Sequence, residues 1–383
     1  MPLDDSESPT YAPTHAPTEP SPATAGRSAL VASGTGDHLP VGPEAVAAEV
    51  GTAETYRERA YAAATLRAYR ADWRHFVAYC AVRGASPLPA DPLVVRTYLA
   101  VSADREGRKV ATLQRRLAAI AYHHREAGHV LAQDDAALKA TWRGIRRTHS
   151  VAPVEKAAAV TETVCAMVDA LPPTLAGVRN RALILIGFAG AFRRAELVAL
   201  DVADLYWQTD GVRITVRSSK TDQEGAGRLK DLPFARHPEH CPVRALQEWL
   251  ERAAIDAGPV FRPLSKAERV LPRRLTDQWV ALAIKRAVVP VAERQAARAW
   301  HRLSHAARAR HDQAVWEAAF VAKVVRQHAG HSLRAGFVTS AAAAGARLDE
   351  IMDQTGHARV DTVMRYVRNA RSLRASAAAK LGL

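Results

Sequence analysis

Apolar residues recur three and four positions apart through most of this chain, and strand-like alternation is confined to one stretch. That stretch is 205–234, where short alternating runs flank residues 222–227, a Gly-containing segment typical of a turn. Helices have a period of 3.6 residues and strands a period of 2, so the two patterns separate clearly. We expect a mainly helical protein with one small three-stranded antiparallel sheet.

The first 52 residues differ in composition from the rest. Residues 1–50 hold eight of the 21 prolines, seven acidic residues and one basic residue, Arg27. Such a segment buries too little apolar surface to offset the entropy cost of ordering, so 1–52 is predicted to be a disordered tail. Two interpretations of its acidity stay open: regulation of a basic groove, or simple solvation.

The net charge points to a polyanionic partner. The 383-residue chain carries +14, and the remainder without the acidic residues 1–50 is six units higher, at +20. Double-stranded DNA is the simplest partner for such a surplus. No apolar run is long enough to cross a bilayer, the acidic N-terminus is unlike a signal peptide, and Cys80, Cys165 and Cys241 are isolated. We expect a DNA-associated cytoplasmic protein without disulfides.

Residues 53–148 are predicted to form a helical DNA-binding domain. Thr65 and Asp91 are expected to cap helices, and further helices are expected to start at Thr112 and at about Asp135. The residues between the apolar positions are mostly of one charge sign, which favours phosphate contact over an ordinary solvated face. The candidate DNA-binding residues are Arg67, Arg70, Arg74, Arg115, Arg116, Lys139, Arg143, Arg146 and Arg147.

A linker at 149–160 is expected to lead into a second domain, 161–383. Helices are predicted near 161–170, 177–191, 242–255 and 275–289, followed by a helical pair within 292–327. His301 and His305 have a spacing that can bind zinc on a helix, but no third ligand is evident, so surface or DNA-facing histidines are favoured and no metal site is predicted. Residues 371–383 are expected to form a short helix that needs a docking surface.

The strongest chemical signal lies between His331 and Tyr366. His331 and Arg334 are three positions apart, His357 follows Thr-Gly, and Tyr366 lies between basic neighbours. Arginine binds phosphate oxygens in a bidentate manner, histidine moves protons near neutral pH, and tyrosine can form a covalent intermediate. Each histidine taken alone could equally be a buried core residue, and Tyr366 a packed helix residue.

Together these positions resemble the tyrosine recombinase family, the phage-type integrases, over about residues 53–383. Arg193-Arg-Ala-Glu196-Leu matches the family's first arginine motif, with Glu196 in a supporting role and Arg194 as the alternative arginine. The family lysine matches Lys220, with Lys230 as the alternative across the same turn. The resemblance assigns the catalytic set to Arg193, Lys220, His331, Arg334, His357 and Tyr366.

The resemblance implies site-specific DNA recombination, as in the integration or excision of a mobile element. Tyr366 would attack a backbone phosphate to give a 3′-phosphotyrosyl link, with no metal, ATP or other cofactor, in a homotetramer on paired DNA sites. The segment before His331 is longer than the family pattern, which predicts an insertion at 292–327. Two alternatives remain: strand relaxation as in type IB topoisomerases, and a non-catalytic DNA-binding protein.

Overall fold

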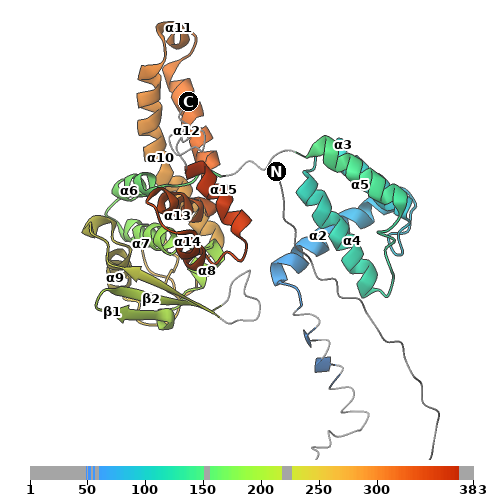
Figure 1. Cartoon of the computed structure of the whole chain (residues 1–383), viewed down its shortest axis with the longest axis horizontal. Helices are drawn as coiled ribbons and strands as arrows, with labels where there is room; N and C mark the ends of the chain where they lie inside the picture. The colour runs from blue at the N-terminus through green and yellow to red at the C-terminus, as the bar shows by residue number, and fades with distance from the viewer. Residues whose placement is uncertain are drawn as a thin grey trace, which may run out of the picture. The chain divides into compact units, whose positions relative to one another are not determined.

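The computed structural model describes residues 60–150, 156–217 and 227–370, together with 49, 51–52 and 55–56. Most of the predicted tail, part of the predicted linker, Lys220 and residues 371–383 lie outside the described residues. The chain divides into two compact units, one within residues 1–151 and the other within 152–383 (Figure 1). We call them unit 1 and unit 2 and describe each by itself.

Within residues 60–150, unit 1 contains four helices, as its apolar periodicity predicts. Asp91 caps its second helix by accepting from the Leu93 amide at 2.7 Å, and Asp135 caps the fourth by accepting from Leu138. The expectation for Thr65 is wrong, because it lies inside the first helix, which starts two residues earlier without a side-chain cap. The helices are α2 (Ala63–Ala81), α3 (Pro92–Asp104), α4 (Val110–Glu126) and α5 (Ala136–His149).

The predicted antiparallel sheet lies in unit 2 and has the order β1-β2-β3. Its strands are β1 (Leu205–Gln208), β2 (Gly211–Val216) and β3 (Arg228–Pro233). Ile214 pairs with Lys230 and Val216 with Arg228. Because side chains alternate along a strand, Lys230 shares the inward face of β3 with Leu232, and both are buried.

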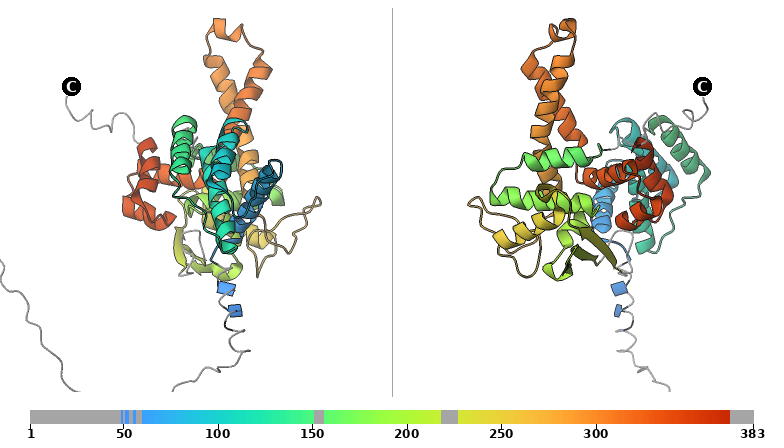
Figure 2. Two further views of the ribbon diagram at one scale, coloured as in Figure 1. Left: turned by 90° about the vertical axis from the view of Figure 1, so that its right-hand side faces the viewer. Right: turned by 60° about the vertical axis from the view of Figure 1, so that its left-hand side comes forward.

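Helices of unit 2 surround an apolar core to which the sheet contributes. No residue of α7 is exposed, and its buried residues run through the whole helix, whereas α9 buries one stripe that includes Trp249. Figure 2 shows the sheet at one end of this helical body. The remaining helices are α6 (Thr161–Asp169), α7 (Leu175–Ala189), α8 (Arg194–Ala199), α9 (Pro242–Arg252), α10 (Asp277–Arg302), α11 (His305–Arg308), α12 (Gln313–Gln327), α13 (His331–Ala343), α14 (Leu348–Thr355) and α15 (Val360–Ala370), with 3-10 turns η1 (Val202–Asp204) and η2 (Pro238–His240).

The segment before His331, where the sequence predicts an insertion at 292–327, is a helical hairpin, which we call the arm (residues 290–327). It projects from the body of unit 2 with α11 at its end (Figures 1 and 2). The expected helix end near residue 289 is wrong, because α10 continues through Pro290. Proline removes one helical hydrogen bond, but Val288, Val291 and Ala292 are buried on either side and hold the helix in place.

Replacing Trp249 should destabilise unit 2. Its ring is fully buried and its indole Nε1 donates to the Val260 carbonyl at 2.8 Å. Trp249→Ala removes both the packing and the hydrogen bond, and is expected to cost about 3–5 kcal/mol in urea unfolding. Trp207, 43% exposed on β1, provides the control, because Trp207→Ala should cost under about 1 kcal/mol. Equal losses would contradict the core assignment.

Candidate active site

Arg193 stands at the start of α8 and is held there by Glu196. The Glu196 carboxylate accepts from the Arg193 backbone amide at 2.9 Å and from its Nη1 at 2.5 Å. Glu196 is buried, while 21% of the Arg193 side chain stays exposed. One carboxylate therefore caps the helix and also fixes the direction of the guanidinium, which explains the spacing of three between them.

Arg334, one turn after the start of α13, is the most deeply buried arginine of the site, with 2% of its surface exposed. Its Nη1 donates to the carbonyl of Ala191 at 2.7 Å. Ala191 has a positive φ of 47°, so the α7–α8 turn is bent in a way that presents this carbonyl to the guanidinium. Burial and the charge of Arg193 lower the pKa of Arg334 to about 10.

His357 follows α14, which ends at Gly356 in the left-handed conformation. The Thr355 hydroxyl donates to the Ile351 carbonyl at 2.7 Å and lies 2.7 Å from His357 Nδ1. Because that hydroxyl proton is already used, Nδ1 carries the imidazole proton, and Nε2 accepts from Arg334 Nη2 at 3.3 Å. Burial and the charge of Arg334 lower the pKa of His357 to about 4, so the ring is neutral at pH 7.

His331 opens α13, one helical turn before Arg334, so both side chains lie on the same side of the helix. Its imidazole reaches solvent. Neighbouring protein atoms, together with the charges of Arg334, Arg193 and Arg194, lower its pKa below the usual value. A neutral imidazole at pH 7 can accept a proton, which suits a general base.

Tyr366 lies on α15 and is half-buried. It packs beside Val338, Ile351 and Val363, a small apolar cluster formed by α13, α14 and α15. The phenol also interacts electrostatically with the Arg334 guanidinium. The structure therefore brings Tyr366, His357, His331 and Arg334 together, although they come from separate helices.

The sheet adds two further cations to this cluster. Lys230 is 3% exposed, and its Nζ donates to the carbonyl of Gln354, beside the end of α14. Arg228, a residue that the sequence analysis missed, lies at the start of β3 with its guanidinium packed over Gly356, where a side chain would leave it no room. The sequence signal that could have identified Arg228 is the alternation of side chains along a strand, which puts residues 228, 230 and the apolar Leu232 on one face.

Positive charges dominate the site. The charges of Arg193 and Arg228 act on Lys230 and on Arg334, and Glu196 is the carboxylate that raises the pKa values of Lys230 and Arg334. Burial, followed by the charge of Arg334, lowers the pKa of Lys230 to about 7. Such a cluster of like charges is suited to an anion, and a phosphate is the anion that planar guanidinium groups fit best.

The predicted DNA-binding residues of unit 1 fall into three groups. Arg115 makes a bidentate ion pair with Asp72, and Lys139 pairs with Asp134. Arg116 is 5% exposed and binds Ser102 and Glu106, so it supports the fold and we leave it out of the proposed DNA contacts. The remaining candidates are exposed on α2 and α5: Arg67, Arg70, Arg74, Arg143, Arg146 and Arg147.

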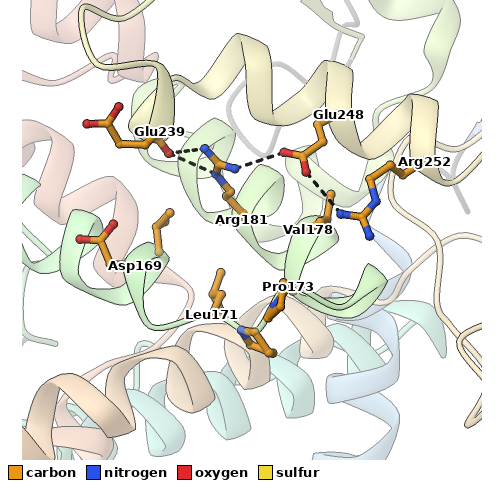
Figure 3. A pocket seen from close by; sticks show the side chains of 11 residues that line it. Asp169, Leu171, Pro173, Val178, Arg181, Glu239, Glu248 and Arg252 are labelled. Atoms are coloured by element: carbon orange, nitrogen blue, oxygen red, sulfur yellow. Dashed lines mark hydrogen bonds and ion pairs between the residues drawn. The ribbon is translucent and has the colours of Figure 1, made fainter.

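Two arginines of unit 2 also lie together outside this cluster, but there they have a carboxylate partner. A hollow of about 300 Å³ beside α7 and α9 contains Arg181 and Arg252, and both guanidinium groups bind the carboxylate of Glu248 (Figure 3). The part of the chain that the structure describes has no group of three His, Cys, Asp or Glu residues placed to hold a metal ion. Nor does any described helix have the length and apolar character needed to cross a membrane.

Comparison with known proteins gives two family matches and several relatives. Residues 160–372 match the phage integrase family, and residues 53–129 match the phage integrase N-terminal SAM-like domain. An integrase/recombinase xerD homolog of Selenomonas ruminantium is 36% identical over 315 residues, covering 81% of this chain and 83% of the relative. Recombinase cre of Escherichia phage P1 is 27% identical over 308 residues, covering 77% and 81%. A crystal structure of XerH recombinase bound to difH DNA aligns with a TM-score of 0.48 and 15% identity, over 76% of this chain and 72% of that one.

The buried lysine should make stability depend on pH. The folded-state pKa of Lys230 is about 7, against an ordinary value of 10.5, so between these pH values the unfolded chain binds the extra proton. The free energy of unfolding should therefore rise with pH across this window, by at most about 1.4 kcal/mol per pH unit from this residue. Lys230→Met should remove that part of the slope in urea unfolding.

Lys285, exposed on α10, gives the control substitution Lys285→Met for the loss of one lysine. A slope that is the same in the Lys230→Met variant and the unsubstituted protein would mean that Lys230 keeps its charge when the protein folds.

Proposed function

The chain belongs to the phage integrase family, the tyrosine recombinases, whose members cleave and rejoin DNA by transesterification, and we propose that it recombines specific DNA sites through a covalent 3′-phosphotyrosyl intermediate. The observation that carries the proposal is the convergence of Arg193, Arg334, His331, His357 and Tyr366 on one strongly positive site. The names of its relatives, a xerD homolog and recombinase cre, also favour site-specific recombination.

The two arginines would hold the scissile phosphate. In the pentacovalent transition state, negative charge gathers on the two non-bridging oxygens, and preorganised guanidinium groups stabilise that charge. Glu196 fixes the position of Arg193 and the Ala191 carbonyl fixes that of Arg334, so neither needs to reorganise during the reaction. Since His357 Nε2 accepts from Arg334, we assign His357 to orienting this guanidinium.

Tyr366 would attack the phosphorus, with its proton passing to His331. The new bond is Oη–P and the broken bond is P–O5′, so the released strand ends in a 5′-hydroxyl. A tyrosine has an ordinary pKa of about 10 and needs a base near neutral pH. The lowered pKa of His331 leaves its imidazole neutral and able to take that proton.

The departing 5′-oxygen requires a proton, because an alkoxide is a poor leaving group. Two lysines compete for this role. Lys220 matches the family pattern and lies outside the described residues, whereas Lys230 is buried within the cluster, with a pKa of about 7. A pKa near the working pH suits proton donation, and both assignments stay open.

Neither ATP nor a metal ion is part of the proposed reaction. The phosphotyrosyl ester retains the energy of the broken phosphodiester, so the second transesterification needs no other energy source. The stabilising charge comes from Arg193, Arg334 and the site lysine. Exchange of both strands between two duplexes requires four cleavages with one tyrosine each, which leads us to propose a homotetramer on paired sites.

The nucleophile can be tested directly. Tyr366→Phe removes only the hydroxyl, so it should abolish the covalent protein–DNA adduct while leaving DNA affinity nearly unchanged. The cognate site is first identified by mapping the DNA ends that become attached to the protein. A nicked substrate that contains this site is then incubated with the protein, and the adduct is detected on a denaturing gel. Tyr206, 54% exposed on β1, provides the control, because Tyr206→Phe should keep the adduct. An adduct in the Tyr366→Phe protein would place the nucleophile elsewhere.

The two lysines can be separated with a substrate that carries sulfur in place of the scissile 5′-oxygen. A thiolate leaves without protonation, so the variant that lacks the general acid should recover cleavage on this substrate. Alanine at that lysine should slow cleavage of ordinary DNA by about 10²–10⁴-fold. We compare Lys220→Ala with Lys230→Ala in single-turnover reactions. Recovery in neither variant would exclude both lysines as the acid.

A further inference from the structure

The end of the arm concentrates positive charge. Residues 294–311 contain five arginines and three histidines but no aspartate or glutamate. This segment covers the last turns of α10, all of α11 and the turn towards α12. We call it the arm tip. Its charge cannot be explained by general basicity alone, because the chain has 39 acidic residues against 53 lysines and arginines.

The arm-tip arginines are exposed, and within the described residues they make no ion pair with a carboxylate. Arg294 donates to the Ala166 carbonyl, which leaves four arginines to consider: Arg298, Arg302, Arg308 and Arg310. The first acidic residue after the tip, Asp312, is occupied as the N-cap of α12.

Several arginines on the body of unit 2, by contrast, have a carboxylate partner. Arg213 pairs with Asp231 at 2.6 Å, Arg252 with Glu248 at 3.4 Å, and Arg347 with Asp349 at 2.6 Å. These surface pairs contribute little stability, but they balance charge. The arm tip thus differs from these pairs, because its neighbouring like charges have no internal balance among the described residues.

The arm holds these charges on a folded support. Trp300 of α10 is 7% exposed and its ring centroid lies 5.6 Å from that of Trp316 on α12, which in turn stacks on Phe320. Ser304 caps α11 by accepting from the Ala307 amide at 3.2 Å. Packing between the two long helices therefore fixes the direction in which the tip points.

We propose that the arm tip binds backbone phosphates of duplex DNA, away from the phosphate held at the active site. The proposal rests on DNA being the substrate of the proposed function. DNA fits because its phosphates form a regular array of negative charge, and arginine binds them without needing a defined base sequence. Helix α12 has 15 residues and is about 22 Å long, so the contact should lie roughly six base pairs or more from the cleaved phosphate.

The experiment measures DNA affinity by fluorescence anisotropy between about 50 and 200 mM salt, on an unrelated duplex that spans several helical turns. In the variant Arg298→Gln, Arg302→Gln, Arg308→Gln, Arg310→Gln, the slope of log affinity against log salt should become shallower by about 2–4, or about 0.9 for each phosphate that the variant no longer neutralises. The corresponding four-lysine variant keeps the charge and should retain most of the slope.

A matched control replaces Arg213, Arg252 and Arg347 with glutamine, because these arginines already have carboxylate partners. Its slope should stay close to that of the unsubstituted protein. Equal slopes in all variants, or equal reductions in the glutamine and lysine variants, would overturn the proposal. An unchanged slope with impaired self-association would instead assign the tip to a protein partner. Because non-specific binding does not require Tyr366, this result is independent of whether strand cleavage occurs.

Discussion

The rest of the site depends on the burial of one positive charge, the guanidinium of Arg334. It is buried, yet its described hydrogen-bond partners are the Ala191 carbonyl and the His357 ring, neither of which carries a compensating charge. Burying a cation without a paired carboxylate costs free energy, and its lowered pKa expresses that cost. A phosphate diester placed against Arg334 would supply the missing negative charge, so substrate binding would relieve a cost already present in the folded protein.

The positions of three chain segments follow from this buried charge. The α7–α8 turn takes a positive φ at Ala191 and presents its carbonyl, and the left-handed Gly356 ends α14 just before His357. Lys230 donates to Gln354 in the last turn of the same helix, which links the sheet to His357. The Glu196 carboxylate partly balances these positive charges, because without it the neighbouring Arg193 would face Arg334 with its full charge.

Sequence patterns predicted local features well, because those features depend on neighbouring residues. Asp91 was identifiable as a helix cap and Asp135 as the approximate start of a helix, and the alternation around 205–234 identified the strands. Lys230 was only an alternative, since its burial depends on a carbonyl 124 residues away that no local pattern reveals. Arg116 was predicted to contact DNA for a similar reason. It lies on a helix rich in charged residues, and only the packing of α3 against α4 shows that its side chain is buried.

The arm leads through α12 directly into His331, the proposed general base, so its position bears on the candidate site. Helix α12 ends at Gln327, and its last carbonyls accept from Lys156 Nζ and the Ala157 amide. Three residues later, Gly330 lies so close to Arg194 that a Cβ there would be 1.9 Å from its side chain. Contacts at Gln327 and at Gly330 thus fix the short segment that connects α12 to His331. A change in the direction of α12 must either break these contacts or move His331. The end of the arm that joins the body of unit 2 therefore constrains the position of the proposed general base.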